Sequence, residues 1–134
     1  MRIDGHCHCG YVRYEAEIDP EMVSICHCAD CQQLTGSAYR VTARARAEDI
    51  QLTANPPKVY RKYGNSGRPR LQYFCPECGS PLFTTGEGAD AAVWGIRVGT
   101  ITQRRELCPK RQKWCSSALP WVDDIAGLPR SEGD

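Results

Sequence analysis

Apolar and polar residues alternate along much of the chain, which is the pattern of β-strands that are buried on one face. The clearest run is YVRYEAEI, in which Val12, Tyr14, Ala16 and Ile18 alternate with charged residues. Shorter segments alternate more weakly, are rich in β-branched and aromatic residues, and are separated by turn-forming residues. These are AYRVTARA (38–45), DIQLTA (49–54), KVYRKYG (58–64), RLQYF (70–74), PLFTT (81–85) and AAVWGIRVG (91–99). The pattern predicts a mainly β fold.

Few helices fit between these strands. The best candidate covers one or two turns over residues 29–35, because Gly36 is suited to end a helix. A second helical turn is expected near residues 108–112, and the final GLPRSEGD is expected to be irregular. Since the chain shows no repeat or linker, we interpret residues 1–134 as a single domain.

The composition leaves a thin apolar interior for a domain of this size. Hydrophobic residues make up 41% of the 134 residues, but this share includes nine cysteines. Without the cysteines, about a third of the chain is left to build a core at ordinary density. Such a core suggests that metal ions crosslink the fold.

Charge is nearly balanced, with 17 Lys and Arg against 16 Asp and Glu. This balance argues against binding to nucleic acid or to an anionic membrane. Basic residues are nevertheless concentrated in two segments, 40–70 and 97–113. The two segments would form a basic patch if they met in space, and would otherwise be solvated strand faces.

The N-terminal MRIDGHCHCG lacks the apolar run of a signal peptide, and no segment approaches the roughly 20 apolar residues of a membrane helix. We therefore expect a cytoplasmic protein. Disulfides rarely persist in a reducing cytoplasm. The nine cysteines, in close C-x-C and C-x-x-C spacings, suit metal ligation better than a disulfide framework. The sequence thus favours zinc bound by thiolates.

The first cysteine pair lies in HCHCG near the N-terminus. We interpret this stretch as extended chain, in which residues two apart point to the same face. The sulfurs of Cys7 and Cys9 would then converge on one ion, while His6 and His8 point away.

The second pair lies in FCPECGSPL, where two thiolates bracket a tight reversal of the chain. Pro76 fixes one backbone angle of this turn, and Gly79 tolerates a left-handed conformation. Two such pairs from distant parts of the chain complete a closed tetrahedral site. The expected ligands of this structural zinc are Cys7, Cys9, Cys75 and Cys78.

The remaining cluster, CHCADC, offers Cys26, Cys28 and Cys31 without an obvious fourth ligand. Three protein ligands and one exchangeable position are the arrangement of a catalytic zinc. By the same alternation, His27 is expected to point away from the two cysteines beside it.

Cys108 and Cys115 lie outside these groups. Either one could close the three-cysteine site and make it structural, so spacing alone leaves the division into four and three ligands open. We interpret both residues as small buried side chains. A redox role is disfavoured because neither lies in a C-x-x-C motif.

The sequence around the cysteines resembles a known family. CHCG, CHCADCQQLTGSAY, FCPECGSPLF and ALPWVDDIAGLPRSEG are similar, in order and over nearly the whole chain, to the glutathione-dependent formaldehyde-activating (GFA) family. The resemblance implies a zinc-supported all-β fold, often called a β-tent, with few short helical turns. It also implies a structural zinc at Cys7, Cys9, Cys75 and Cys78 and a catalytic zinc at Cys26, Cys28 and Cys31.

The named activity of the family joins glutathione to formaldehyde and gives S-hydroxymethylglutathione, formally a carbon–sulfur lyase reaction run in reverse. The resemblance therefore implies two zinc ions per chain and, as substrates, a small-molecule thiol and an aldehyde. The family also includes centromere protein V-like proteins. A zinc-stabilised binding module without catalysis is thus the alternative function.

The chain departs from common family members at positions that bear on the substrate. Gln32 and Gln33 stand where a basic residue often follows the third cysteine, and Ser131 replaces a usual aromatic residue. The segment GTITQRREL also lacks a frequent acidic pair. None of these changes touches a metal position.

An open three-thiolate site has a plausible chemical task. Zinc with three thiolates carries a formal charge of −1 and still holds a fourth thiol in its deprotonated form. A free thiol is only a few per cent thiolate at neutral pH, so metal binding would raise the attacking species roughly tenfold. We hypothesise that the glutathione sulfur binds there and attacks an aldehyde carbon. Its two carboxylates would pair with arginines of the group Arg68, Arg70, Arg97, Arg104 and Arg105.

Overall fold

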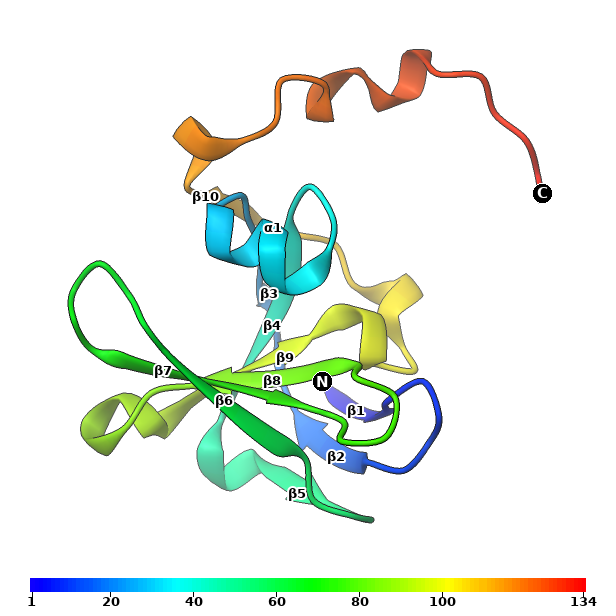
Figure 1. The fold of residues 1–134 in the computed structure, drawn as a ribbon. Coiled ribbons are helices and arrows are strands. Elements are labelled where there is room, and N and C mark those ends of the chain that lie inside the picture. The colour runs from blue at the N-terminus through cyan, green and yellow to red at the C-terminus, as the bar shows by residue number, and fades with distance from the viewer.

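The computed structural model describes all 134 residues, which form ten β-strands, one α-helix and six short 3-10 helices. The strands build two sheets, one of three strands and one of seven (Figure 1). The prediction of a mainly β fold is therefore confirmed. None of the helices has the length and apolar character needed to traverse a bilayer.

The smaller sheet is antiparallel and has the order β1-β2-β5. Its strands are β1 (Arg2–His6), β2 (Arg13–Glu17) and β5 (Ile50–Leu52). The larger sheet has the order β10-β3-β4-β9-β8-β7-β6 and is antiparallel except for the pair β10–β3. Its strands are β3 (Asp19–Cys26), β4 (Arg40–Arg46), β6 (Lys58–Tyr63), β7 (Pro69–Phe74), β8 (Pro81–Thr85), β9 (Val93–Arg97) and β10 (Arg111–Lys113).

Helix α1 (Ala29–Thr35) connects β3 to β4 and covers the predicted helical residues. Gly36 ends it as predicted, with φ at 65° and its N–H donating to Gln32 O at 2.9 Å. The 3-10 helices are Ala47–Asp49, Gly88–Ala92, Val98–Thr100, Arg104–Glu106, Cys115–Ser117 and Val122–Gly127. After β10 the chain runs past α1 and extends away from both sheets (Figure 1).

Every strand predicted from alternation is present, with ends that shift by at most two residues. Strands β1, β3 and β10 were not predicted. In β3 the alternation is weak because the register with β4 shifts between Asp19 and Ser24, so buried and exposed side chains do not alternate along the strand.

The helical turn predicted at residues 108–112 is wrong. Residues 108–110 have no regular structure, and residues 111–113 form β10. Backbone hydrogen bonds along β3 hold this segment extended, from Lys110 N to Val23 O (2.8 Å) and from His27 N to Lys113 O (3.0 Å). An edge strand of three polar residues leaves no alternation to detect.

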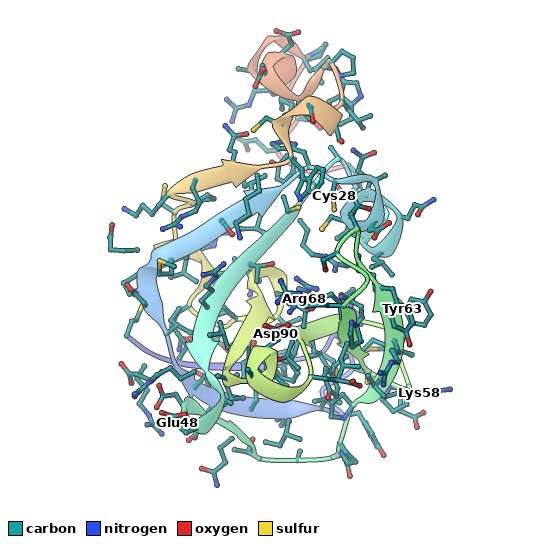
Figure 2. All side chains as sticks on the ribbon, turned by 90° about the vertical axis from the view of Figure 1, so that its left-hand side faces the viewer. Cys28, Glu48, Lys58, Tyr63, Arg68 and Asp90 are labelled. Atoms are coloured by element: carbon teal, nitrogen blue, oxygen red, sulfur yellow. The ribbon has the colours of Figure 1, made fainter.

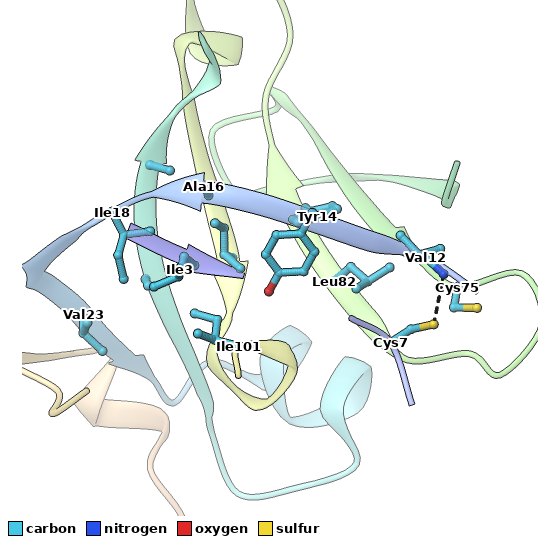
Figure 3. Packing of buried hydrophobic residues seen from close by; sticks show 14 residues of the cluster. Ile3, Cys7, Val12, Tyr14, Ala16, Ile18, Val23, Cys75, Leu82 and Ile101 are labelled. Carbon is cyan, nitrogen blue, oxygen red and sulfur yellow. Dashed lines mark hydrogen bonds between the residues drawn. The ribbon is translucent and has the colours of Figure 1, made fainter. Parts of the chain in front are cut away.

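A cluster of 14 buried hydrophobic residues joins the two sheets (Figure 3). Tyr14 of β2 packs edge-on against Phe83 of β8, with ring centroids 4.9 Å apart. Its hydroxyl shares a hydrogen bond of 2.8 Å with Thr100 Oγ1, so the buried polar atom is satisfied. Cys7 and Cys75, both fully buried, belong to the same cluster. The core is thus continuous with the cysteines at its edge.

We expect Gly5→Ala to lower the free energy of unfolding by about 3 kcal/mol, because overpacking strains a filled core. Gly5 pairs with Tyr14 across β1 and β2, and a Cβ added there would lie 2.3 Å from the Tyr14 ring and 2.5 Å from Thr100 O. Chemical denaturation measures the effect. Gly99→Ala is the matched control, since an added Cβ meets nothing within 4 Å and stability should stay within about 0.5 kcal/mol.

Candidate metal centres

The first cysteine pair lies in a turn that connects β1 to β2. Cys7 N–H donates a hydrogen bond to Val12 O, and Gly10 N–H donates one to Cys7 O, both at 3.1 Å. Gly10 has φ at 81°, which only glycine adopts readily. The prediction that Cys7 and Cys9 sit on extended chain is therefore wrong. A tight turn, and not strand alternation, brings their sulfurs to 3.6 Å.

The second pair lies in the turn between β7 and β8 and is built in the same way. Gly79, with φ at 78°, donates its N–H to Cys75 O at 2.9 Å. The backbone N–H groups of Glu77 and Cys78 point at Cys75 Sγ from 3.4 and 3.5 Å. Ser80 bonds to the Cys78 sulfur and lowers the pKa of Cys78 to about 5. The turn thus favours the thiolate of Cys78.

The two turns meet and form a four-cysteine cluster. All four sulfur atoms lie within 4.8 Å of one another, and Cys9 Sγ is 3.8 Å from Cys75 Sγ. Val12 N–H donates to Cys7 Sγ at 3.3 Å beside Cys75 (Figure 3). No histidine or carboxylate belongs to the cluster. The four sulfurs, which could hold a metal ion, belong to Cys7, Cys9, Cys75 and Cys78.

The second cluster lies where β3 passes into α1. Cys26 ends β3, Cys28 is the N-terminal cap of α1, and Cys31 lies in the first turn of the helix. Cys31 N–H donates to Cys28 Sγ at 3.3 Å. The three sulfur atoms lie within 4.8 Å of one another and could also hold a metal ion. The change from strand to helix at this point therefore brings the three sulfur atoms of the C-x-C-x-x-C motif close together.

No fourth side chain completes the second cluster. His27 points away as predicted, because it is 1% exposed and its Nε2 lies 2.7 Å from Gln112 Oε1 of β10. Cys108 and Cys115 belong to neither cluster. The prediction that they are buried is wrong: both are exposed, on segments that flank the edge strand β10.

Three thiols in one place repel each other when they are charged. Burial disfavours the thiolate of Cys28, yet the Cys31 N–H, the neighbouring thiols and Lys62 together lower its pKa. Burial and the neighbouring thiols raise the pKa of Cys31 to about 12. The cluster can therefore hold more than one thiolate only beside a cation, and soft sulfur donors suit a thiophilic ion such as zinc.

The three-cysteine cluster opens onto a cavity of about 490 Å³. Cys26 and Cys31 line the cavity together with two acidic residues, Asp30 and Asp90. In Figure 2, Cys28 lies near α1, while Arg68 and Asp90 lie together farther down the molecule. Six basic residues line the cavity: Arg40, Arg44, Lys62, Arg70, Arg97 and Lys113. The two basic segments of the sequence therefore meet in space, around a hollow and not on a flat strand face.

Only part of the arginine group expected to meet a substrate faces this cavity. Arg70 and Arg97 line it, whereas Arg104 and Arg105 do not. Arg68 forms an ion pair with Asp90, its Nη1 3.2 Å from the carboxylate. The two arginines that line the cavity lie in strands of the larger sheet, Arg70 in β7 and Arg97 at the end of β9, whereas the other three lie outside its strands.

Two of the basic side chains are almost completely buried, with Arg40 4% and Arg97 8% exposed. Arg97 donates from Nη1 to Thr42 Oγ1 at 2.8 Å and from Nη2 to Gln72 Oε1 at 2.7 Å. Arg40 Nη1 donates to the same Gln72 oxygen at 3.1 Å. Burial, and next the charge of Arg40, lower the pKa of Arg97 to about 9. The protein therefore holds two neighbouring cations in a poorly solvated place.

A comparison with protein-family models gives a match over residues 2–117 to the family described as glutathione-dependent formaldehyde-activating enzyme. The chain belongs to the GFA family. The resemblance noted in the sequence is thereby confirmed.

A solved structure of a Rhodobacter sphaeroides protein is similar to this GFA-family chain, with a TM-score of 0.64 and 21% sequence identity. The match covers 82% of this chain and 99% of the other. At this identity the likeness shows the fold alone. A comparison with curated proteins found no match.

In this member of the GFA family, Gln32 has a structural contact in place of a positive charge. Its Nε2 donates to His27 O at 2.8 Å and to Ser117 O at 3.0 Å. The side chain therefore ties α1 to the segment that follows β10. The cationic groups near the cysteines come instead from the sheet.

Sequence reasoning missed several residues of the cavity, namely Arg40, Arg44, Lys62, Gln72 and Lys113. The signal that could have found the basic ones was their concentration in two segments. This concentration did not indicate which basic residues lie close together, because the strands that carry them become neighbours only in the folded sheet.

Proposed function

We propose that this protein is a zinc-dependent enzyme that joins a small-molecule thiol, such as glutathione, to a small aldehyde, such as formaldehyde. The observation that carries this proposal is the convergence of three thiols on a cavity lined by six basic residues. Membership of the GFA family supports the same chemistry. The reaction is of the carbon–sulfur lyase class, written in the direction of synthesis.

The two cysteine clusters would have different roles. A zinc ion held by four cysteines has no free position and would serve structure, clipping the β1–β2 turn to the β7–β8 turn. A zinc ion held by Cys26, Cys28 and Cys31 keeps one position open. Both donor sets consist of sulfur, which fits zinc better than a hard cation such as magnesium.

The reaction forms one carbon–sulfur bond and moves one proton. The thiol sulfur attacks the aldehyde carbon, the electron pair of the C=O bond passes to oxygen, and that oxygen takes up a proton in place of the one lost from sulfur. Zinc at the open site would supply a position that keeps a thiol deprotonated at neutral pH. Lys62 is paired with Asp30. Lys113, which has no carboxylate partner, is thus the ammonium group free to protonate the new hydroxyl oxygen.

The charge of the cavity suits an anionic thiol. Glutathione carries two carboxylates and one ammonium group, so its net charge is negative, and six basic residues against two acidic ones line the cavity. Guanidinium groups bind carboxylates through two parallel hydrogen bonds. The cavity would therefore attract the thiol and hold it with its sulfur near the three cysteines.

The alternative, a zinc-stabilised binding module, is less well supported by this arrangement. A module for an acidic macromolecule would present its basic residues on an exposed surface. Here six of them surround a hollow of about 490 Å³, which is the size of a small-molecule site. We further propose that residues 1–134 act as one zinc-binding domain and work in the cytoplasm, where reducing conditions keep the thiols available as ligands.

We expect the purified protein to bind two zinc ions per chain. A chelator should remove the ion of the three-cysteine site first, because its open position admits a competing ligand. Elemental analysis and a chelator titration with a zinc-sensitive dye measure both quantities. A stoichiometry of one after saturation with zinc would contradict the two-site assignment.

Substitution of one ligand should distinguish the two sites. Cys75→Ser should lower stability by about 4 kcal/mol or more and the melting temperature by about 15 °C, because its metal-binding energy is folding energy. Cys31→Ser should retain most of the stability but lose thiol binding and formaldehyde consumption with glutathione. Thermal melts, glutathione titration and an assay of free aldehyde compare the pair.

Cys108→Ser is the matched control for this pair, because Cys108 is exposed and belongs to neither cluster. It should change neither stability nor thiol binding. If Cys75→Ser and Cys31→Ser destabilise equally, and the unmodified protein binds no thiol, both clusters are structural and the binding module replaces the enzyme.

A further inference from the structure

The buried pair of Arg40 and Arg97 has no carboxylate partner within the chain, and the cysteines of the nearby cluster are the only anionic groups that act on it. Neither guanidinium forms an ion pair, and the only acceptors they reach are the neutral oxygens of Gln72 and Thr42. The Nε atoms of both arginines are buried and have no hydrogen-bond partner. Buried charges are ordinarily paired. Something from outside the chain is therefore needed to balance this pair.

The acidic residues of the cavity do not provide this balance. Asp30 is paired with Lys62, and Asp90 is paired with Arg68. Three thiolates with one zinc ion would add a single negative charge, which is less than the two charges of the arginine pair alone. The cavity therefore keeps an excess of positive charge after every internal partner is counted.

The sheet holds the pair in a fixed arrangement before any ligand arrives. Arg40 begins β4, Arg97 ends β9 and Gln72 lies in β7. The amide of Gln72 is oriented by its hydrogen bond from Nε2 to Thr84 Oγ1 at 3.0 Å, so that Oε1 faces both guanidinium groups. A guanidinium has five N–H donors, and most of those in this pair stay unused. Groups held in this way lose little entropy when they bind an anion.

We propose that Arg40 and Arg97, bridged by Gln72, form a carboxylate-binding site in the wall of the cavity. The planar forks of two guanidinium groups match the two oxygens of a carboxylate. The site itself depends only on the arginines and not on the metal. The role of this site in catalysis rests on the proposed function. If the protein joins a thiol to an aldehyde, the bound carboxylate belongs either to the thiol or to an aldehyde that carries a carboxylate, such as glyoxylate.

Acetate is the probe for the site, and thermal melting of the zinc-loaded protein is the measurement. Acetate should raise the melting temperature of the unmodified protein in a saturable way, because a ligand that binds only the folded state stabilises it. Gln72→Glu places a carboxylate between the two arginines. This variant should melt at a higher temperature without acetate and should lose at least tenfold in acetate affinity.

Arg44→Gln is the matched control, because Arg44 lines the cavity but is exposed and lies outside the pair, and its loss lowers the cavity charge by the same unit. This variant should keep the acetate response, whereas Arg40→Gln should weaken acetate binding about tenfold. The proposal is overturned if acetate has no effect on the unmodified protein, or if Gln72→Glu responds as strongly. The latter result would place acetate on the metal.

Titration calorimetry distinguishes the two sources of the carboxylate. If the thiol carries it, Gln72→Glu should weaken glutathione binding at least tenfold but leave binding of fully esterified glutathione unchanged. If the aldehyde carries it, Gln72→Glu should weaken glyoxylate binding tenfold and leave glutathione binding unchanged. If neither affinity falls, the assignment of the carboxylate to the thiol or to the aldehyde is overturned, and the acetate response alone decides whether the site exists. Cys31→Ser should keep the acetate response, so a failure of the proposed enzyme chemistry would not be mistaken for the absence of the carboxylate site.

Discussion

The meeting of two turns, one between β1 and β2 and the other between β7 and β8, is the contact on which the rest of the structure depends. Cys7 and Cys75 are fully buried and belong to the hydrophobic core, while their partners Cys9 and Cys78 face solvent. The cluster thus closes one end of the space between the two sheets. Because the apolar core holds only 14 residues, a metal ion bound by this cluster would fix how the sheets face each other.

Fixing the sheets in this way also fixes the cavity. All seven strands of the larger sheet contribute to its lining, together with α1 and the 3-10 helix Gly88–Ala92, so the cavity exists only when that sheet is complete. Backbone pairing in the sheet holds positively charged side chains close together at positions that are poorly exposed to solvent. Arg40 and Arg97 stay in place because each has a backbone partner in a neighbouring strand, Arg40 opposite Cys26 of β3 and Arg97 opposite Thr42 of β4.

The sequence predicted the parts of the structure that depend on short spacing. Within each cysteine pair or triplet the residues are two or three positions apart, and alternation located seven of the ten strands. It could not predict that Arg40, Gln72 and Arg97 meet, because β4, β9, β8 and β7 are ordered by the folded sheet. Basic residues within strands also look like solvated positions until a second element faces them. The turn at Cys7 was misjudged for a related reason, since Gly10 and not the spacing of the cysteines sets its conformation.

If both clusters bind zinc as proposed, their surroundings, more than the type of ligand, would separate a structural metal site from a reactive one. Both consist of sulfur alone, and both use backbone N–H groups to favour thiolates. The four-cysteine cluster is completed by its own turns. The three-cysteine cluster instead opens toward unpaired cations that attract an anion. A substrate that carries both a thiol and a carboxylate would satisfy the open metal position and the buried arginines together, and this double requirement would exclude simple thiols from the cavity.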